Sequence, residues 1–259
     1  MRISNPMTQP SISLSPLKYA DGSASYTSPT GEMILGSVNG PVEVTRRDTQ
    51  KPEEATLEVI VKPGVGSSGV GERYVEGIIR GVLSRVILMR DRNLARKGIV
   101  VTLVVMGNKS CDGKVAERGG SYLQILPSLL NTSLLALLSA AIPMSMTYAS
   151  TIIAVSPSGE LIQNPSAHDI ITAKSTHVLA FSSKGHLLLN ESDGSFDMEI
   201  WDKVHDLAQL TCQSGTDGIK PGQDVDMEAT FKPEPVAQIV RDAIEDRLRE
   251  DHAWKLLDV

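Results

Sequence analysis

Apolar residues recur along the chain with two periods, and each period predicts one kind of element. Alternating polar and apolar positions in short β-branched runs predict strands, whereas apolar residues three or four positions apart predict amphipathic helices. The predicted strands are residues 21–25, 33–39, 42–44, 56–62, 99–105, 147–155, 161–162, 177–181 and 186–189. The predicted helices are residues 72–89, 129–141, 197–212 and 236–249. Strands followed by helices, twice over, predict an α+β chain of two lobes.

Breaks in this pattern indicate how the chain is organised. Residues 1–19 are polar and interrupted by proline, which predicts a flexible lead-in. The first lobe then covers residues 20–145 and the second covers residues 146–259. A glycine-rich, charged segment at 107–126 reads as an excursion from the first lobe, and an acidic segment at 214–235 reads as a flexible insertion in the second.

Composition narrows the classes of function. With 259 residues and 41% hydrophobic content, the chain can bury a substantial core. A formal net charge of -6 argues against a stand-alone protein that neutralises nucleic-acid phosphates, and an aromatic content of 4% argues against a base-stacking platform. Any RNA contact is therefore expected to be local or to depend on partner chains.

Cysteine and histidine spacing predicts no metal site. Cys111 and Cys212 lie far apart, and the five histidines are scattered without a metal-ligand pattern. The first residues lack the apolar segment of a signal peptide, and the apolar stretch 129–144 is interrupted by polar residues. We therefore expect a soluble protein of a reducing intracellular compartment, with no cofactor and no membrane contact.

A glycine-rich segment, Gly64-Val65-Gly66-Ser67-Ser68-Gly69, matches the dinucleotide-binding pattern between a predicted strand and a predicted helix. Two further observations disfavour a cofactor site. The preceding strands are predicted to form an antiparallel meander. The strand 99–105 is also not followed by an acidic residue that could bond the ribose of a dinucleotide. We interpret the segment as a flexible loop.

The segment 80–97 is strongly basic. It holds Arg80, Arg85, Arg90, Arg92, Arg96 and Lys97 against Asp91 alone, a local net charge of 6 − 1 = +5. One interpretation is a surface for RNA or for another subunit. The alternative, which we favour, is that these cations complement a helix dipole and solvate a loop.

Five motifs taken in order resemble the ribonuclease PH family, and most closely the non-phosphorolytic ring subunits of the eukaryotic RNA exosome. They are Asp21-Gly22-Ser23-Ala24-Ser25, Gly40-Pro41-Val42-Glu43-Val44, the run 55–63, the apolar run 129–144 and Asn164-Pro165-Ser166. The resemblance covers about residues 20–213 and the last helix. It implies a ribonuclease PH-like fold, with two pseudo-related β/α lobes of mixed sheets and packed helices.

The resemblance also implies that the catalytic residues are missing. Active members carry a Gly-Thr-Arg run before the helix 129–141, where this chain has Gln124-Ile125-Leu126. A second phosphate-binding arginine is replaced by Gly71, and a pair of aspartates by Ile170 and Thr176. Asp169 is adjacent, but we interpret it as a loop or cap residue. We therefore expect no catalytic and no metal-binding residue. The alternative is an active phosphorolytic 3′-to-5′ exoribonuclease whose acids are misaligned.

Family rings imply the remaining expectations. They predict a pseudo-hexameric ring of three heterodimers, pairing with ribosomal RNA processing protein 43, S1/KH cap proteins and an associated 3′-to-5′ nuclease. Single-stranded RNA would pass through the assembled ring for rRNA processing and RNA degradation, in the nucleus, nucleolus and cytoplasm. Candidate RNA contacts are Lys62 and Arg73 at the glycine-rich loop, and then Arg90, Arg92, Arg96 and Lys97.

Overall fold

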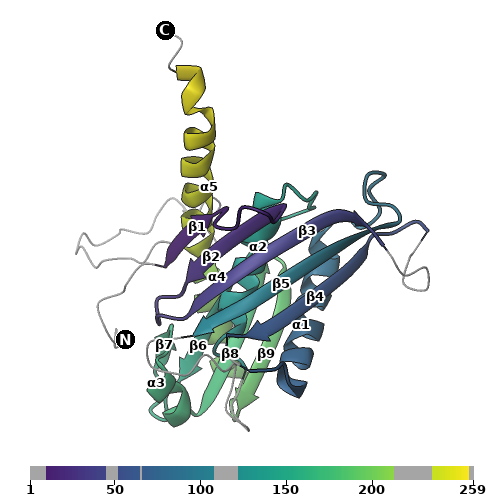
Figure 1. The fold of residues 1–259 in the computed structure, drawn as a ribbon. Helices are drawn as coiled ribbons and strands as arrows, with labels where there is room; N and C mark the ends of the chain where they lie inside the picture. The colour runs from purple at the N-terminus through teal and green to yellow at the C-terminus, as the bar shows by residue number, and fades with distance from the viewer. Residues whose placement is uncertain (1–9, 45–51, 65, 108–121, 213–234, 257–259) are drawn as a thin grey trace.

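A computed structural model of the chain describes residues 10–44, 52–64, 66–107, 122–212 and 235–256 (Figure 1). The strands are β1 (Ser11–Leu14), β2 (Gly22–Thr27), β3 (Met33–Glu43), β4 (Thr56–Pro63), β5 (Lys97–Gly107), β6 (Tyr148–Val155), β7 (Leu161–Gln163), β8 (Ser175–Ser182) and β9 (Leu187–Gly194). The helices are α1 (Val70–Val86), α2 (Leu126–Ser139), α3 (Ala167–Thr172), α4 (Met198–Cys212) and α5 (Val236–His252), with a final 3₁₀ turn at Ala253–Leu256.

The first sheet has the strand order β1-β2-β3-β5-β4 and is antiparallel except for its last pair. Strands β4 and β5 run parallel, with Val59 opposite Val101, and α1 is the crossover that connects them. The expectation of an antiparallel meander is therefore wrong at this point. Parallel strands cannot be joined by a tight turn, so the 17 residues of α1 supply the return path.

The second sheet is wholly antiparallel, with the order β7-β6-β8-β9. Every residue of its two central strands, β6 and β8, is buried. Helix α2 packs on one face of this sheet and α4 on the other, so both faces of β6 exclude water. Continuous apolar runs are typical of strands that are covered in this way.

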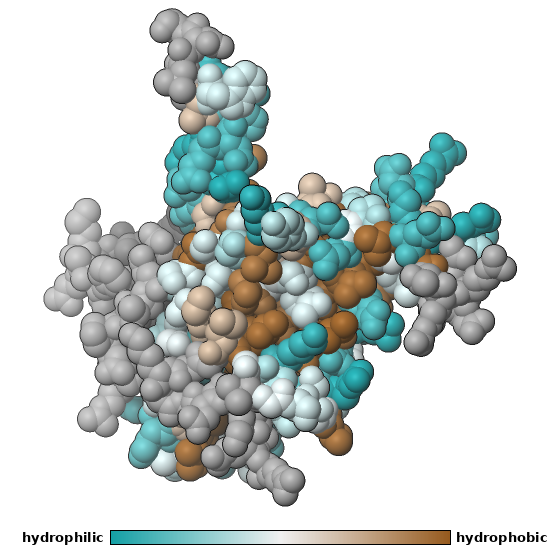
Figure 2. Space-filling view, viewed as in Figure 1, coloured by the Kyte–Doolittle hydropathy of each residue, from teal (hydrophilic) through white to brown (hydrophobic). Residues whose placement is uncertain are grey.

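Helix α2 lies between the two sheets and forms the centre of the core. It packs against β2 and β3 on one side and against β6 on the other. Its residues 126–137 are all buried, which agrees with the mostly apolar helix predicted from the sequence. Its polar members are satisfied inside the core, because Asn131 bonds Ser150 and Ser133 bonds Tyr148. None of the described helices covers the opposite face of the first sheet, and Figure 2 shows apolar side chains along it.

Four local features differ from the sequence prediction. Gly40-Pro41 is not a turn between two strands, because β3 continues through it with a register shift between Asn39 and Val42. Proline lacks an N–H, so it fits such an irregularity. Strand β1 lies within the predicted lead-in and pairs with β2. Helix α3 was not predicted. Helix α1 ends at Val86, three residues before the predicted end at Met89.

The domain division stays a prediction, although the first sheet uses only residues 11–107 and the second only residues 148–194. The excursion 107–126 and the insertion 214–235 lie mostly outside the described residues. Across the described parts of the chain, no helix is both long and apolar enough to cross a membrane. The second half of α5 projects beyond both sheets (Figure 1).

Candidate nucleic-acid interface

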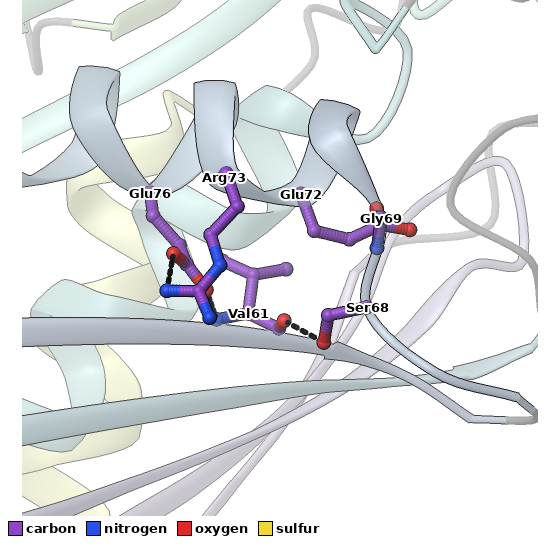
Figure 3. A network of polar contacts seen from close by, with 6 residues as sticks. All are labelled: Val61, Ser68, Gly69, Glu72, Arg73 and Glu76. Carbon is purple, nitrogen blue, oxygen red and sulfur yellow. Dashed lines mark hydrogen bonds and ion pairs between the residues drawn. The ribbon is translucent and has the colours of Figure 1, made fainter.

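The glycine-rich loop joins the end of β4 to the start of α1, as the sequence predicts (Figure 3). The Ser68 hydroxyl donates a hydrogen bond to the Val61 carbonyl oxygen at 3.1 Å, which ties the loop back to β4. Gly66 has a φ of +97°, a conformation that side chains other than glycine rarely adopt. The parallel β4–α1–β5 unit also gives this loop the strand–turn–helix context that a dinucleotide site needs.

The N-terminus of α1 is nevertheless closed by the chain's own carboxylate. The Gly69 backbone N–H donates to Glu72 Oε2 at 2.7 Å, and the Glu72 residue is buried. A carboxylate at this position is stabilised by the positive end of the helix dipole. A phosphate group would have to displace it, so the structure disfavours anion binding at this helix end.

Arg73 lies one turn into α1 and is held beside β4. Its Nη1 lies 3.4 Å from Glu76 Oε2, and the other carboxylate oxygen of Glu76 accepts the Val61 N–H at 2.9 Å (Figure 3). The Arg73 side chain is 76% exposed, whereas that of Glu76 is 10% exposed. A mostly buried acid therefore positions a guanidinium that solvent, or a nucleic-acid phosphate, can still reach.

Lys62 is exposed on β4, opposite Val104 of β5. The remaining candidates, Arg90, Arg92, Arg96 and Lys97, precede or begin β5. Lys97 is seven residues before Val104 on this strand, which is roughly 23 Å at about 3.3 Å per residue. The six predicted contacts therefore form two groups at opposite ends of the first sheet, and no single RNA phosphate can contact both.

Several arginines of the basic segment have structural partners. Arg80 donates twice to the Leu57 carbonyl oxygen, at 3.0 and 2.7 Å, and Arg85 donates to the Leu188 carbonyl oxygen at 3.2 Å. Arg90 forms an ion pair with Glu54 at 3.0 Å. These contacts favour the interpretation that much of the segment stabilises the fold, and they leave the loop end as the better RNA candidate.

A second carboxyl group lies at the start of α2, where active family members are expected to bind phosphate. The Glu32 carboxyl accepts hydrogen bonds from the side chains of Gln124 and Ser128. The backbone N–H of Leu126 already donates to the Tyr122 carbonyl oxygen at 3.2 Å, and Pro127 has no N–H. The end of this helix therefore offers a phosphate few free amides and one opposing carboxyl.

The other expected catalytic positions are also occupied by unsuitable groups. Gly71 lies in the first turn of α1, and a side chain there would collide with the Tyr122 hydroxyl. Ile170 belongs to α3, and Thr176 is buried in β8. No group of three histidine, cysteine, aspartate or glutamate side chains among the described residues could hold a metal ion.

Asp169 is a helix-capping residue, as the sequence analysis interprets it. Its carboxylate accepts hydrogen bonds from the Ser166 N–H at 3.0 Å and the Ser166 hydroxyl at 2.7 Å. These bonds hold the pKa of Asp169 below its usual value. Sequence reasoning missed Glu32, Glu72 and Tyr122. Only Glu72 has a local signal, namely an acid three residues after the helix cap.

The buried Glu32 carboxyl makes stability depend on pH. Burial raises its pKa from 4.5 to about 7, so between these values the folded chain binds a proton that the unfolded chain releases. The free energy of unfolding should therefore fall by roughly 3 kcal/mol as pH rises from 4.5 through 7. Glu32→Gln should abolish this fall and be more stable than the native chain at pH 8.

Urea denaturation of both chains between pH 4 and 8 measures this difference. Burial lowers the pKa of His177, and Ser166 lowers that of Asp169, but these contributions are common to both chains and cancel in the comparison. Parallel pH profiles for the two chains would contradict a buried, readily protonated Glu32.

No protein-family model matches the sequence. The chain is 28% identical over 206 residues to the exosome complex component RRP46 of Saccharomyces cerevisiae, which covers 76% of this chain and 87% of the yeast protein. It is 29% identical over 152 residues to the exosome complex exonuclease RRP46 homolog of Oryza sativa subsp. japonica, which covers 59% of this chain and 57% of the rice protein.

Solved structures agree with these relatives. The crystal structure of rice Rrp46 aligns with a TM-score of 0.67 and 26% identity, over 79% of this chain and 89% of the rice chain. The Archaeoglobus fulgidus exosome with RNA bound to the active site aligns with a TM-score of 0.60 over 78% of this chain and 84% of the other. That second match has 12% identity and shows the fold alone. The chain therefore has a ribonuclease PH-like fold, and the proteins to which it is similar include the RRP46 proteins of yeast and rice.

Proposed function

We propose that this chain is a non-catalytic ring subunit of an RNA exosome. The observation that carries the proposal is its similarity to yeast RRP46, an exosome complex component, along 87% of the yeast protein. In this role the chain scaffolds a pseudo-hexameric ring that guides RNA to 3′-to-5′ processing and degradation.

The electrostatics of the two helix ends support a role without catalysis. Phosphorolysis needs a cationic cradle for phosphate, and acids that usually act with a divalent metal. Here Glu72 lies at the start of α1 and Glu32 at the start of α2. The Glu72 carboxylate would repel an incoming phosphate, and the buried Glu32 carboxyl, whose pKa is raised to about 7, supplies no cation at the other helix end. At Gly71 the Tyr122 hydroxyl occupies the place that a side chain would take.

The partners in this proposal are the other subunits of the exosome. The chain pairs with ribosomal RNA processing protein 43, and the ring carries S1/KH cap proteins and an associated 3′-to-5′ nuclease. Single-stranded RNA passes through the assembled ring during rRNA processing and RNA turnover. The complex acts in the nucleus, including the nucleolus, and in the cytoplasm. Isolation of the tagged chain from cells, with identification of its stoichiometric companions, tests these assignments.

Incubation of the purified chain with a 3′-extended RNA, inorganic phosphate and Mg²⁺ should release no nucleoside diphosphate above a buffer blank. The reason is that the chain's own carboxyl groups occupy both helix ends at which the attacking phosphate would bind. Chromatography of the products measures the release. An active archaeal or bacterial enzyme of the same fold, treated in parallel, shows that the assay detects phosphorolysis.

One observation favours an active enzyme, namely that the name of the rice relative includes the word exonuclease. In that case Asp169 is the nearest available acid, although it caps α3. Asp169→Asn separates the two functions. Diphosphate release by the native chain that disappears in this variant would establish the enzyme and overturn the scaffold.

Charge reversal at Lys62 and Arg73 in a reconstituted ring should weaken protection of a threaded RNA more than reversal at Arg90 and Arg92. Lys62 and Arg73 lie at the glycine-rich loop, whereas Arg90 is engaged with Glu54 at the far end of the sheet. Each lost phosphate contact lowers the salt slope of single-strand binding by roughly 0.7, so the pair lowers it by roughly 1.4.

Nuclease footprinting and the salt dependence of RNA affinity measure this ranking. Thermal denaturation of each variant ring controls for assembly, because Arg73→Glu also loses its contact with Glu76. The opposite ranking would place the RNA path along the basic run at residues 90–97.

A further inference from the structure

The edge strands β4 and β9 differ in whether side chains bond their outward backbone groups. On β4 several of these groups are bonded. Side chains bond its outward backbone groups: Glu76 accepts the Val61 N–H at 2.9 Å, and Ser68 donates to the Val61 carbonyl oxygen at 3.1 Å. Arg80 donates twice to the Leu57 carbonyl oxygen. An approaching strand would find these ladder positions taken, which is a common protection against edge pairing.

Among the described residues, the outer edge of β9 lacks such bonds from Asn190 to Asp193. The Ser195 N–H donates to the Lys174 carbonyl oxygen at 3.2 Å, which sets the alternation of hydrogen bonds between β8 and β9. This alternation directs the backbone groups of Asn190 and Ser192 away from β8. Arg85 bonds the outward carbonyl of Leu188 and reaches no further along the strand. Among the described residues, no hydrogen bond to the outward backbone of 190–193 is present.

The chain that runs from β9 into α4 carries exposed apolar residues and many acidic ones. Phe196 packs edge-on against His177 and is 37% exposed, and Met198 at the start of α4 is 68% exposed. Six acids lie within residues 190–206 against one lysine, a local net charge of 1 − 6 = −5. Those six acids are Glu191, Asp193, Asp197, Glu199, Asp202 and Asp206. Exposed apolar residues with a charged rim are typical of interaction surfaces.

We propose that the outer edge of β9, from Asn190 to Asp193, binds an extended basic segment of a neighbouring ring subunit by strand addition. The inference rests on the proposed function, which supplies the neighbouring subunit. Backbone hydrogen bonds from Asn190 and Ser192 supply affinity, as in other strand-addition complexes. Glu191 and Asp193 project to one face of β9, so they select lysine or arginine at alternate positions of the incoming strand.

Hydrogen exchange of the chain, free and in the reconstituted ring, tests this pairing directly. In the free chain the outward amides of Asn190 and Ser192 should exchange rapidly. In the ring their exchange should slow by about 100-fold or more, because they become donors in a sheet ladder. Unchanged exchange at these two amides in an assembled ring would overturn the proposal and leave the proposed function standing.

Two variants test the same edge through assembly, followed by native mass spectrometry of the co-expressed ring. Asn190→Pro removes an outward N–H, and Asn190→Ala is its control because it keeps that N–H. The double variant Glu191→Lys/Asp193→Lys reverses the charge, and Glu53→Lys/Glu160→Lys is its control because these exposed acids lie elsewhere. We expect each test variant to reduce incorporation at least about tenfold and each control to change it less than about twofold.

The outcomes separate the two ideas. A native chain that never enters the ring overturns both the proposed function and this inference. If the native chain enters the ring and both test variants are incorporated at the same level, the inference is overturned and the proposed function stands. Protection of Asn190 and Ser192 that rises with the concentration of the free chain would identify a second copy of this chain as the occupant, and would also overturn it. If Asn190→Pro fails to fold, incorporation of the Glu191→Lys/Asp193→Lys variant still tests the inference.

Discussion

Replacing Asn131 by alanine is expected to lower the free energy of unfolding by about 3 kcal/mol. The Asn131 side chain joins α2 to the second sheet. It donates to the Ser150 carbonyl oxygen at 3.1 Å and accepts from the Ser150 N–H and hydroxyl, each at 3.0 Å. It also bonds the buried Tyr26 hydroxyl from the first sheet. The Ser150 hydroxyl would keep its bond to the Pro127 carbonyl oxygen, but alanine would remove the partner of the Ser150 backbone groups and of the Tyr26 hydroxyl. Each buried group left unpaired typically costs 1–3 kcal/mol.

Urea denaturation followed by circular dichroism measures this loss. Ser84→Ala is the matched control, because it removes an exposed hydroxyl that donates only to Gly81 within α1. We expect the control to change stability by less than about 0.5 kcal/mol. A loss below about 1 kcal/mol for Asn131→Ala would show that its hydrogen bonds contribute little to joining α2 to the second sheet.

The second large effect is expected at Gly22, the first residue of β2. A Cβ at this position would collide with the backbone at the C-terminal end of α2, at Ala136 and Ala140. Backbone cannot move aside as a flexible side chain can, so the helix and the strand would have to separate. We expect Gly22→Ala to cost about 3 kcal/mol.

Two other glycines provide the control, because they lie on the exposed side of α1. A Cβ at Gly77 or Gly81 would meet nothing within 4 Å. Alanine there should raise the free energy of unfolding by about 1 kcal/mol each, since glycine weakens a helix interior. The same substitution is thus expected to act with opposite signs at the two places. Stabilisation by Gly22→Ala would contradict the close approach of β2 to α2.

The local pattern of apolar and polar residues was sufficient to predict most of the secondary structure. The period of apolar residues identified the four long helices of the described chain, α1, α2, α4 and α5. Alternation of polar and apolar residues identified β4, and a continuous apolar run identified β5. It was also sufficient to interpret Asp169 as a cap residue, because its partner Ser166 is only three residues away. Features that depend on neighbours within a few residues can be read along the chain.

Short elements were harder to predict, because their stability comes from their surroundings. Strand β1 has four residues and exists because it pairs with β2. The polar and apolar positions of β4 looked the same for either strand direction, so they could not reveal that β4 and β5 run parallel. That direction follows from the path of α1, which the tertiary structure alone defines.

The amino-acid sequence by itself determined the periodic elements, the glycine-rich loop, the acidic net charge and the ordered motifs of the ribonuclease PH family. Only the tertiary structure placed Glu32 beside Ser128, 96 residues away, and Tyr122 against Gly71. It also separated the six candidate cations into two groups, and within the described parts of the chain it capped the edge of β4 but not that of β9. The physical reason is that propensity acts between neighbours in sequence, whereas burial, charge pairing and edge capping act between residues that folding brings together.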